Sequence, residues 1–401
     1  MSDNQIHYGS RYTTIVLFCI SFLFFSGFYF FSIASDYQKH VEIVMGIAAG
    51  SQQPFPNFVY HLSIYIFSLL NLEFGPLFLA SALVSALAVA AKYFFSHKYI
   101  KEYASGTTSP PNLREDKNFR RIIISFSVML VFVFSLPITV LLGGDFYLLN
   151  FPPNVWHNPT TILLMPFAVI LFWVSYRQLE NPTSNRITAI TLLCIINILI
   201  KPSFFFIFCG VYPLFFLSKH GFKVEFWKNM IPIIIGIALV YFEYYLLYAE
   251  ADSSSGVAIG LFTVWAHYSP NIPLAFLGSI FFPIVYFGFY WRSLIKSLLF
   301  KYSVTLLALA VVVFSVLIET GSRKYHGNFA WQYIVANYIL YMVIIALFVK
   351  RIYQSNSGEH LSIPNLLLHT NWKDKVILSI YLVQFILGIY YFINFYIKLG
   401  Y

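Results

Sequence analysis

Long apolar runs separated by short polar segments make up most of the chain. A run of roughly 17 to 25 apolar residues is long enough to cross a bilayer as a helix. Such runs lie at about 12–34, 76–96, 122–143, 160–176, 230–249, 272–290, 303–319, 333–350 and 376–397. A further run, 188–217, is interrupted by Lys201-Pro202-Ser203 and predicts two short helices that meet near one face. The pattern predicts an all-α protein with about 11 transmembrane helices.

Two shorter apolar segments follow the first long run. From Asp36 to about Gly46, apolar residues recur at helical spacing among charged ones, which predicts an amphipathic helix lying on the membrane surface. The segment from about Asn57 to Leu70 is apolar but only about fourteen residues long, and it follows two prolines. If it crossed the membrane, the basic loops would fall on both sides. We therefore expect interfacial helices in a first outer loop, residues 35–75.

The composition changes this picture little. The sequence is 59% hydrophobic and 10% charged, which excludes an ordinary soluble domain of 401 residues. The first apolar run lacks a small-residue cleavage site, so we expect it to remain as a helix. The three cysteines all lie inside apolar runs and have no metal-ligand spacing. No repeat is evident, and residues 1–401 are interpreted as a single transmembrane domain.

The charge distribution predicts the orientation. With the amino terminus in the cytoplasm, every strongly basic loop falls on the cytoplasmic side, including the polar linker 97–121. The carboxyl terminus then lies on the outer, periplasmic side of what we expect to be a bacterial inner membrane. The net charge of +9 is explained by these loops and requires no nucleic acid. The lysines and arginines left on the outer side are Lys39, Lys201, Arg323, Lys324 and Lys398.

Asp36 is the first candidate for chemistry. It directly follows the first long run, with Lys39 and His40 within the next helical turn. An ionisable residue beside hydrocarbon is costly unless it has a partner or a function, and a shielded carboxylate can act as a general base towards a hydroxyl group. Ser35 and Asp36 are also good helix-capping residues, so a purely structural role stays open. Our hypothesis makes Asp36 catalytic and His40 a substrate contact.

The loop before Pro159 is the second candidate. Trp156, His157 and Asn158 together offer a stacking surface and neutral hydrogen-bonding groups, which suit a sugar ring better than an ion. The structural alternative is a helix start at Asn158-Pro159 with Trp156 as an interfacial anchor.

Lys201 lies between two apolar segments and is the third candidate. Its side chain could extend to water, or it could bind a phosphate together with the free amide groups of the following helix. We favour the phosphate.

The segment Glu319–Gln332 holds the densest polar cluster of the outer side. Arginine, lysine and histidine side chains are natural phosphate ligands, and a tryptophan can stack on a sugar. A solvated loop that joins two helices is the alternative. The predicted phosphate ligands are Arg323, Lys324 and His326, and the predicted substrate contacts are Glu319, Asn328 and Trp331.

These features resemble the glycosyltransferase C superfamily, whose multi-spanning enzymes take a sugar from a polyprenyl-phosphate carrier. The resemblance rests on Asp36 after the first helix, the proline-containing segment Gln53–Asn57, the break at Lys201-Pro202-Ser203 and the late outer loop Glu319–Gln332. It covers most of the chain as an arrangement. There is no Trp-Trp-Asp motif, which argues against the oligosaccharyltransferase branch, and no adjacent acidic pair follows the first helix. In its size and simple ending the chain is more similar to bacterial members that modify surface polysaccharides or glycolipids.

The resemblance implies an inverting transfer to a glycan or glycolipid acceptor. Asp36 would deprotonate the acceptor hydroxyl, and Lys201, Arg323, Lys324 and His326 would neutralise the carrier phosphate. No cofactor is required; a divalent metal, if used, could be held by Asp36, Glu42 and Glu319. Two alternatives stay open: a surface-polysaccharide polymerase, which a large arginine-rich outer loop would favour, and a lipid-linked sugar transporter or flippase, which internal repeats and polar groups at mid-membrane depth would favour.

Overall fold

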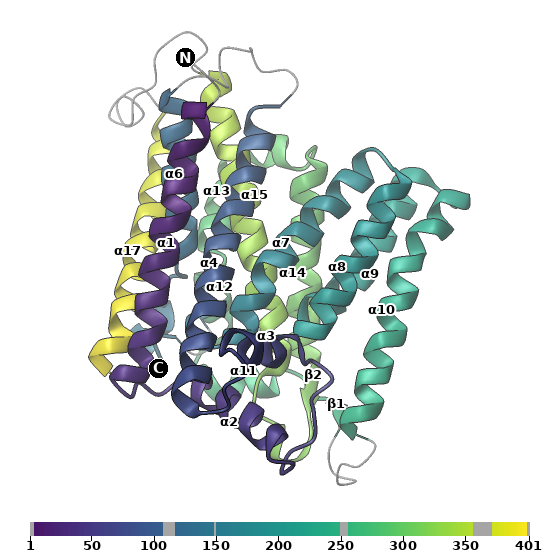
Figure 1. Ribbon diagram of the computed structural model, residues 1–401. Helices are drawn as coiled ribbons and strands as arrows, with labels where there is room; N and C mark the ends of the chain where they lie inside the picture. The colour runs from purple at the N-terminus through teal and green to yellow at the C-terminus, as the bar shows by residue number, and fades with distance from the viewer. Residues whose placement is uncertain (1–3, 107–116, 148–149, 249–255, 356–370, 399–401) are drawn as a thin grey trace.

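Long helices run side by side through the molecule and connect at its two ends (Figure 1). The computed structural model describes residues 4–106, 117–147, 150–248, 256–355 and 371–398. The long elements are α1 (Asn4–Phe30), α4 (Phe74–Ala104), α6 (Lys117–Phe132), α7 (Pro159–Glu180), α8 (Ser184–Ile200), α9 (Ser203–His220), α10 (Val224–Tyr248), α13 (Phe281–Leu294), α14 (Leu298–Val316), α15 (Trp331–Ser355) and α17 (Trp372–Lys398).

The short elements gather mostly at one end of this bundle (Figure 1). They are α2 (Asp36–Ala48), α3 (Val59–Phe67), η1 (Ile138–Leu142), α11 (Thr263–Tyr268), α12 (Ile272–Ser279), η2 (Gly321–Arg323), η3 (Asn328–Ala330) and the strands β1 (Val257–Ile259) and β2 (Leu317–Glu319). The two strands pair antiparallel, with Val257 opposite Glu319.

The predicted class, an all-α polytopic membrane protein, is confirmed. Within the described ranges, eight helices are long and apolar enough to cross a membrane, and α12 with α13, bent by 66°, makes a ninth if the pair counts as one span. The other two of the eleven expected spans are the shorter helices α6, with 16 residues, and α8, with 17 residues.

The run expected at 122–143 differs from the prediction because α6 ends at Phe132. Beyond that residue, the Phe134 amide donates to the Gln384 carbonyl and the Leu136 amide donates to the Gly278 carbonyl, and each hydrogen bond is 3.0 Å long. Bonds to α17 and α12 thus replace the next helical turn. Backbone polar groups in an apolar setting need such partners, and an apolar run by itself does not reveal that they come from other helices.

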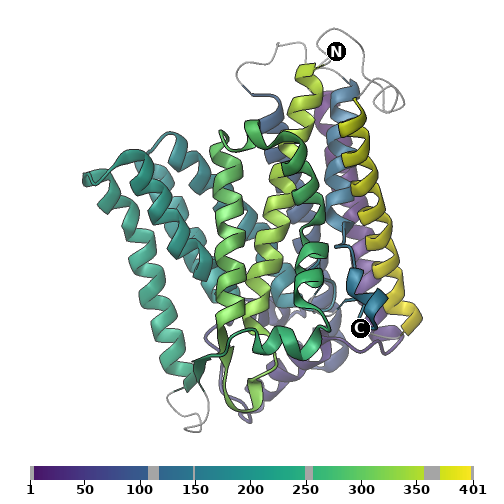
Figure 2. The ribbon, with the colours of Figure 1, turned by 180° about the vertical axis from the view of Figure 1, so that it is seen from behind.

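The helix α15 occupies the centre of the bundle (Figure 2), and 94% of its most apolar 18-residue stretch is buried inside the protein. It packs against α4, α14, α9, α6, α7 and α13. The helix α10 lies at the edge, and only 28% of its most apolar 18-residue stretch is buried. Apolar side chains that remain exposed on such a helix face the hydrocarbon of the bilayer.

The first outer loop contains α2 and α3. The helix α3 has nine residues and is therefore only about 14 Å long, whereas a bilayer core is about 30 Å thick. This segment does not cross the membrane as a helix. The helix α2 is amphipathic as expected and buries Tyr37, Val41 and Val44. Both helices lie at the end of the bundle where α17 finishes (Figure 1).

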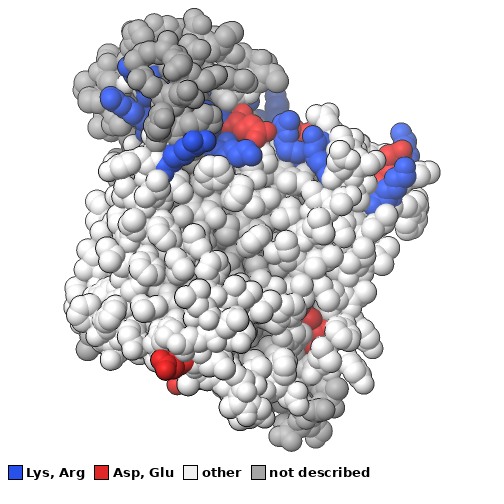
Figure 3. Space-filling view, viewed as in Figure 1, with Lys and Arg blue, Asp and Glu red and all other residues white. Residues whose placement is uncertain are grey.

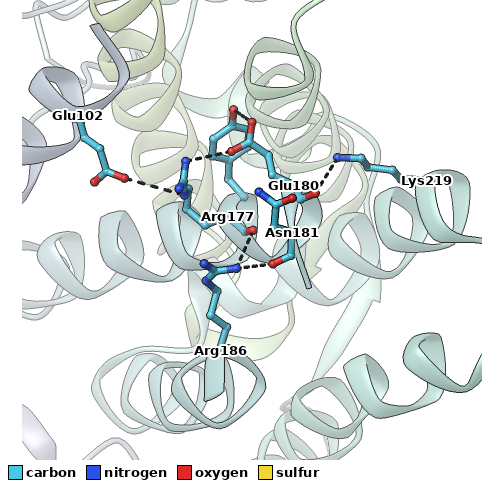
Figure 4. A network of polar contacts seen from close by, with 7 residues as sticks. Glu102, Arg177, Glu180, Asn181, Arg186 and Lys219 are labelled. Atoms are coloured by element: carbon cyan, nitrogen blue, oxygen red, sulfur yellow. Dashed lines mark hydrogen bonds and ion pairs between the residues drawn. The ribbon is translucent and has the colours of Figure 1, made fainter. Parts of the chain in front are cut away.

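Basic side chains gather at the opposite end of the molecule, near the start of α1 (Figure 3). There Arg177 lies 3.2 Å from Glu180 and 3.9 Å from Glu102, and Lys219 donates to the Glu180 carbonyl (Figure 4). These contacts join the ends of α4, α7 and α9. In the predicted linker 97–121, α4 continues to Ala104 and α6 begins at Lys117; residues 107–116 lie outside the described residues.

Candidate functional site

A cavity of about 520 Å³ opens at the end of the bundle that carries α2 and α3, away from the basic end. Six segments form it: the start of α2, the segment between α2 and α3, the loop before α7, the α8–α9 break, α11 and the segment between β2 and α15. We call it the polar cavity. Of the residues predicted from sequence, it brings together Asp36, His40, His157, Asn158, Lys201, Arg323, His326, Asn328 and Trp331.

Asp36 is held by the loop before α7. Its backbone amide donates to the His157 carbonyl over 3.3 Å, and its Oδ2 accepts a hydrogen bond of 2.8 Å from Asn158 Nδ2. Asn158 also caps α7, because its Oδ1 accepts from the Thr161 amide at 3.0 Å. The capping and the functional interpretation of Asn158 are therefore compatible. Capping fixes the side chain so that its amide nitrogen points at the carboxylate.

Lys201 points into the same network. Its Nζ lies 3.2 Å from Asn158 Oδ1 and 3.1 Å from Thr161 Oγ1, and it sits 4.3 Å from the centre of the Trp331 ring. Burial lowers the pKa of Lys201 to about 7, although the charges of Asp36 and Glu319 act in the opposite direction. The side chain does not extend away to open water. Its acceptors are neutral amide and hydroxyl oxygens, so an anion entering the cavity would find a cation with little competition.

The segment between β2 and α15 forms the outer wall of the polar cavity. Arg323, His326 and Asn328 line it and are exposed. Asn328 Nδ2 donates to Glu319 Oε2 over 2.6 Å, and pairing of β2 with β1 fixes the backbone at Glu319. The predicted contact Glu319 thus lies behind Asn328 and orients it, and does not itself line the cavity.

Two histidines of the cavity, His40 and His157, are neutral hydrogen-bonding groups at pH 7. His157 contacts Tyr147, with Nε2 and the hydroxyl 3.4 Å apart, and burial lowers the pKa of His157 to about 4. His40 Nδ1 lies 3.0 Å from His61 Nε2. Burial, followed by the neighbouring His61 and Lys201, lowers the pKa of His40 to about 3. This state suits the predicted contact with sugar hydroxyls rather than binding of charge.

Two further predicted residues lie outside the cavity. Trp156 is fully buried and packs among Phe24, Phe132 and Phe392. The prediction that it stacks on substrate is therefore corrected: its large apolar ring is used in the core between α1, α6 and α17. Lys324 is exposed, and its Nζ lies over the Tyr325 ring and not in the cavity wall.

Several hydroxyl groups of the cavity were not predicted from the sequence. Tyr147, Tyr268, Tyr325 and Thr160 line it, and the Tyr268 hydroxyl donates to the Tyr325 carbonyl over 2.9 Å. The chain has 30 tyrosines, and many lie at helix ends, where tyrosine is common in membrane proteins. Residue type alone gave no signal that separated these tyrosines from the others.

The described residues contain no group of three or more histidine, cysteine, aspartate or glutamate side chains arranged to hold a metal ion. The three carboxylates that the sequence offers as possible metal ligands are not brought together. Asp36 lines the cavity, Glu42 is exposed on α2 and Glu319 lies behind Asn328.

Comparison of the sequence with models of known protein families gives no match, and no curated protein is similar enough to count as a relative. The chemistry of the site therefore rests on its own geometry. That geometry combines one half-buried carboxylate with two lysines, Lys39 and Lys201, an arginine and several neutral hydrogen-bonding groups around a space large enough for a sugar phosphate.

Proposed function

We propose that the protein is a glycosyltransferase that moves a sugar from a polyprenyl-phosphate donor to a hydroxyl group of a glycan or glycolipid. One observation carries the proposal: the polar cavity places the Asp36 carboxylate together with the cations Lys201 and Arg323, which come from segments 165 and 287 residues further along the chain. A base on one side and cations on the other are what displacement of a phosphate requires.

In this reaction the acceptor oxygen attacks the anomeric carbon of the sugar and inverts it. The acceptor proton passes to Asp36, and the bond between the anomeric carbon and the phosphate oxygen breaks. The electron pair of that bond stays on the phosphate, where Lys201 and Arg323 stabilise the negative charge. Trp331 and the neutral groups His157, Asn158 and Asn328 contact the sugar, because an aromatic ring and uncharged donors match its faces and hydroxyls.

The orientation is part of the proposal. Basic side chains gather at the end of the bundle opposite the polar cavity (Figure 3). By the positive-inside rule the basic end faces the cytoplasm and the cavity faces the outside. The start of α1 and the end of α17 lie at opposite ends of the bundle (Figure 1). This arrangement fits a cytoplasmic amino terminus and an outer carboxyl end in an inner membrane, where polyprenyl-linked sugars would be used on the outer face.

The test is sugar transfer by the purified protein in detergent, with a panel of synthetic prenyl-phosphate sugars and radiolabelled sugar as the readout. We expect turnover of one donor. Arg323→Gln should raise the KM for that donor by about tenfold, because one charge-assisted hydrogen bond is worth about 1.5–3 kcal/mol when buried and less on an exposed side chain. Arg292→Gln at the basic end is the matched control and should leave KM unchanged.

The other outcomes lead to different functions. Extension of a lipid-linked oligosaccharide into longer chains, without use of any monosaccharide donor, would make the protein a polymerase. Movement of a fluorescent lipid-linked sugar across proteoliposomes, without transfer, would make it a flippase. Either result would refute the proposed reaction.

A further inference from the structure

A second cavity, almost entirely apolar, lies between α2 and α3 and has a volume of about 440 Å³. Val44 and Ile47 of α2 and Leu62 and Tyr65 of α3 form its walls, together with Phe55. We call it the apolar groove. Leu62 is 44% exposed, although exposure of a large apolar side chain to water is unfavourable. A wall of this kind is stable when hydrocarbon covers it.

The apolar groove adjoins the polar cavity. Phe55 lines both. Beside it, His40 lines the polar cavity and His61 lines the groove, and the two imidazoles are hydrogen-bonded to each other at 3.0 Å. The Phe55 ring stacks on the His61 ring, with centroids 6.1 Å apart. The junction therefore has one polar side, formed by neutral histidines, and one aromatic side.

The segment that carries Phe55 is fixed close to Lys201. Asn57 Nδ2 donates to the Ile198 carbonyl and to Glu243 Oε1, and each hydrogen bond is 2.9 Å long. Ile198 is three residues before Lys201 at the end of α8. The buried Glu243 side chain of α10, which has no place in the proposed reaction, thereby holds the junction against the helix pair that presents the lysine.

We propose that the apolar groove binds the hydrocarbon chain of the lipid phosphate whose phosphate lies at Lys201. The inference rests on the proposed function for the identity of the ligand and adds the place of its chain. The chain leaves the phosphate, passes Phe55 and the His40–His61 pair, and continues between α2 and α3 into the membrane. A polar head at one end and a chain at the other match the order of the two cavities.

The volume sets the length that is bound. An apolar cavity of about 150 Å³ holds one benzene molecule, so the groove volume of about 440 Å³ accommodates roughly 18 carbon atoms, or three to four isoprene units, on the same scale. That is room for one chain and not for the two chains of a phospholipid. The remainder of a longer carrier would extend into the bilayer.

The first test measures binding without turnover, so that it does not depend on the proposed reaction. The purified 401-residue protein in detergent is irradiated with a prenyl monophosphate of about 20 carbons, matched to the groove volume, that carries a diazirine near the end of its chain. We expect labelling within residues 44–72, with competition by unlabelled prenyl monophosphate and not by phosphatidylglycerol. Labelling only on other helices, or equal competition by the phospholipid, overturns the proposal.

The second test compares two exposed apolar residues on α3. Leu62 lines the groove, whereas Ile66, which is 53% exposed, does not. Leu62→Glu should raise the KM for a 20-carbon donor by at least about tenfold, because a charge now lies against the chain, with kcat and the KM for a 5-carbon analogue unchanged. Ile66→Glu should change neither. Equal effects of the two variants, or an equal effect of Leu62→Glu on both donors, overturn the proposal.

The two proposals fail separately. Labelling of the groove without turnover of any sugar donor would support the lipid site and count against the transferase. Turnover that is insensitive to Leu62→Glu would support the transferase and remove the lipid site.

Discussion

Replacing the Asp36 carboxylate is the sharpest perturbation of the polar cavity. Asp36→Asn keeps the size of the side chain, and its amide oxygen can still accept the hydrogen bond from Asn158 Nδ2 that the carboxylate accepts at 2.8 Å. What the variant cannot do is take a proton from the acceptor. The change therefore separates the catalytic role from the structural one.

The two roles predict different magnitudes. A hydrogen bond to a charged group contributes about 1.5–3 kcal/mol and a neutral one about 0.5–1.5 kcal/mol, so Asp36→Asn should lower the free energy of unfolding by only about 1 kcal/mol. Loss of a general base costs about 10²- to 10⁴-fold in rate, which is about 3–5 kcal/mol of transition-state stabilisation. We expect kcat to fall by this factor while the KM for the donor changes by less than about threefold.

The assay is sugar transfer at saturating donor, with thermal unfolding in the same detergent as the check on folding. Glu42→Gln is the matched control, because Glu42 is an exposed carboxylate on the same helix and lies outside the polar cavity. Full activity of Asp36→Asn would refute the assignment of the base. An equal loss in Glu42→Gln would show that the charge of α2, and not one carboxylate, is required.

Three further predictions follow from the site and the core. Burial lowers the pKa of Lys201 to about 7, so its amine is charged below that pH and neutral above it, and the KM for the donor should rise above pH 7. In Lys201→Arg the side chain stays charged, so the KM should not change with pH. The same dependence of KM on pH in both proteins would contradict this role of Lys201. Trp331→Ala removes the ring 4.3 Å from Lys201 and should raise the KM about 2- to 30-fold, with Trp331→Phe in between; an unchanged KM would exclude the ring from binding. Gly388→Ala places a methyl group onto the Phe132 carbonyl and should lower the melting temperature in detergent by several degrees. Gly288→Ala, where the methyl group meets open space, should leave the melting temperature unchanged. Equal melting temperatures of the two variants would show that α17 does not pack against α6 at Phe132.

Much of the polar cavity was predictable because few polar groups are available at that end of the molecule. In a chain that is only 10% charged, Asp36, Lys201 and Arg323 stand out as ionisable residues between apolar runs, and all three line one cavity. Prediction of a site residue from its type and its position in the sequence fails where the residue fits two different structural roles. Trp156 fits an interfacial anchor or a stacking platform by sequence, and it is in fact a core residue.

The amino-acid sequence alone determined the helical class and the approximate limits of the helices, because a long apolar segment in a bilayer must satisfy its backbone hydrogen bonds within itself. The sequence left open whether residues 57–70 cross the membrane, and the structure decided it, because α3 has only nine residues and is too short to cross as a helix. Tertiary structure alone decided where α6 ends, since the Phe134 and Leu136 amides bond to α17 and α12. It alone decided the partners of Asp36 and Lys201, because the Asn158 side chain that lies between them becomes their neighbour only when the loop before α7 meets the start of α2 and α7 packs beside α8. Contacts between distant segments depend on how the helices pack, and no local pattern specifies them.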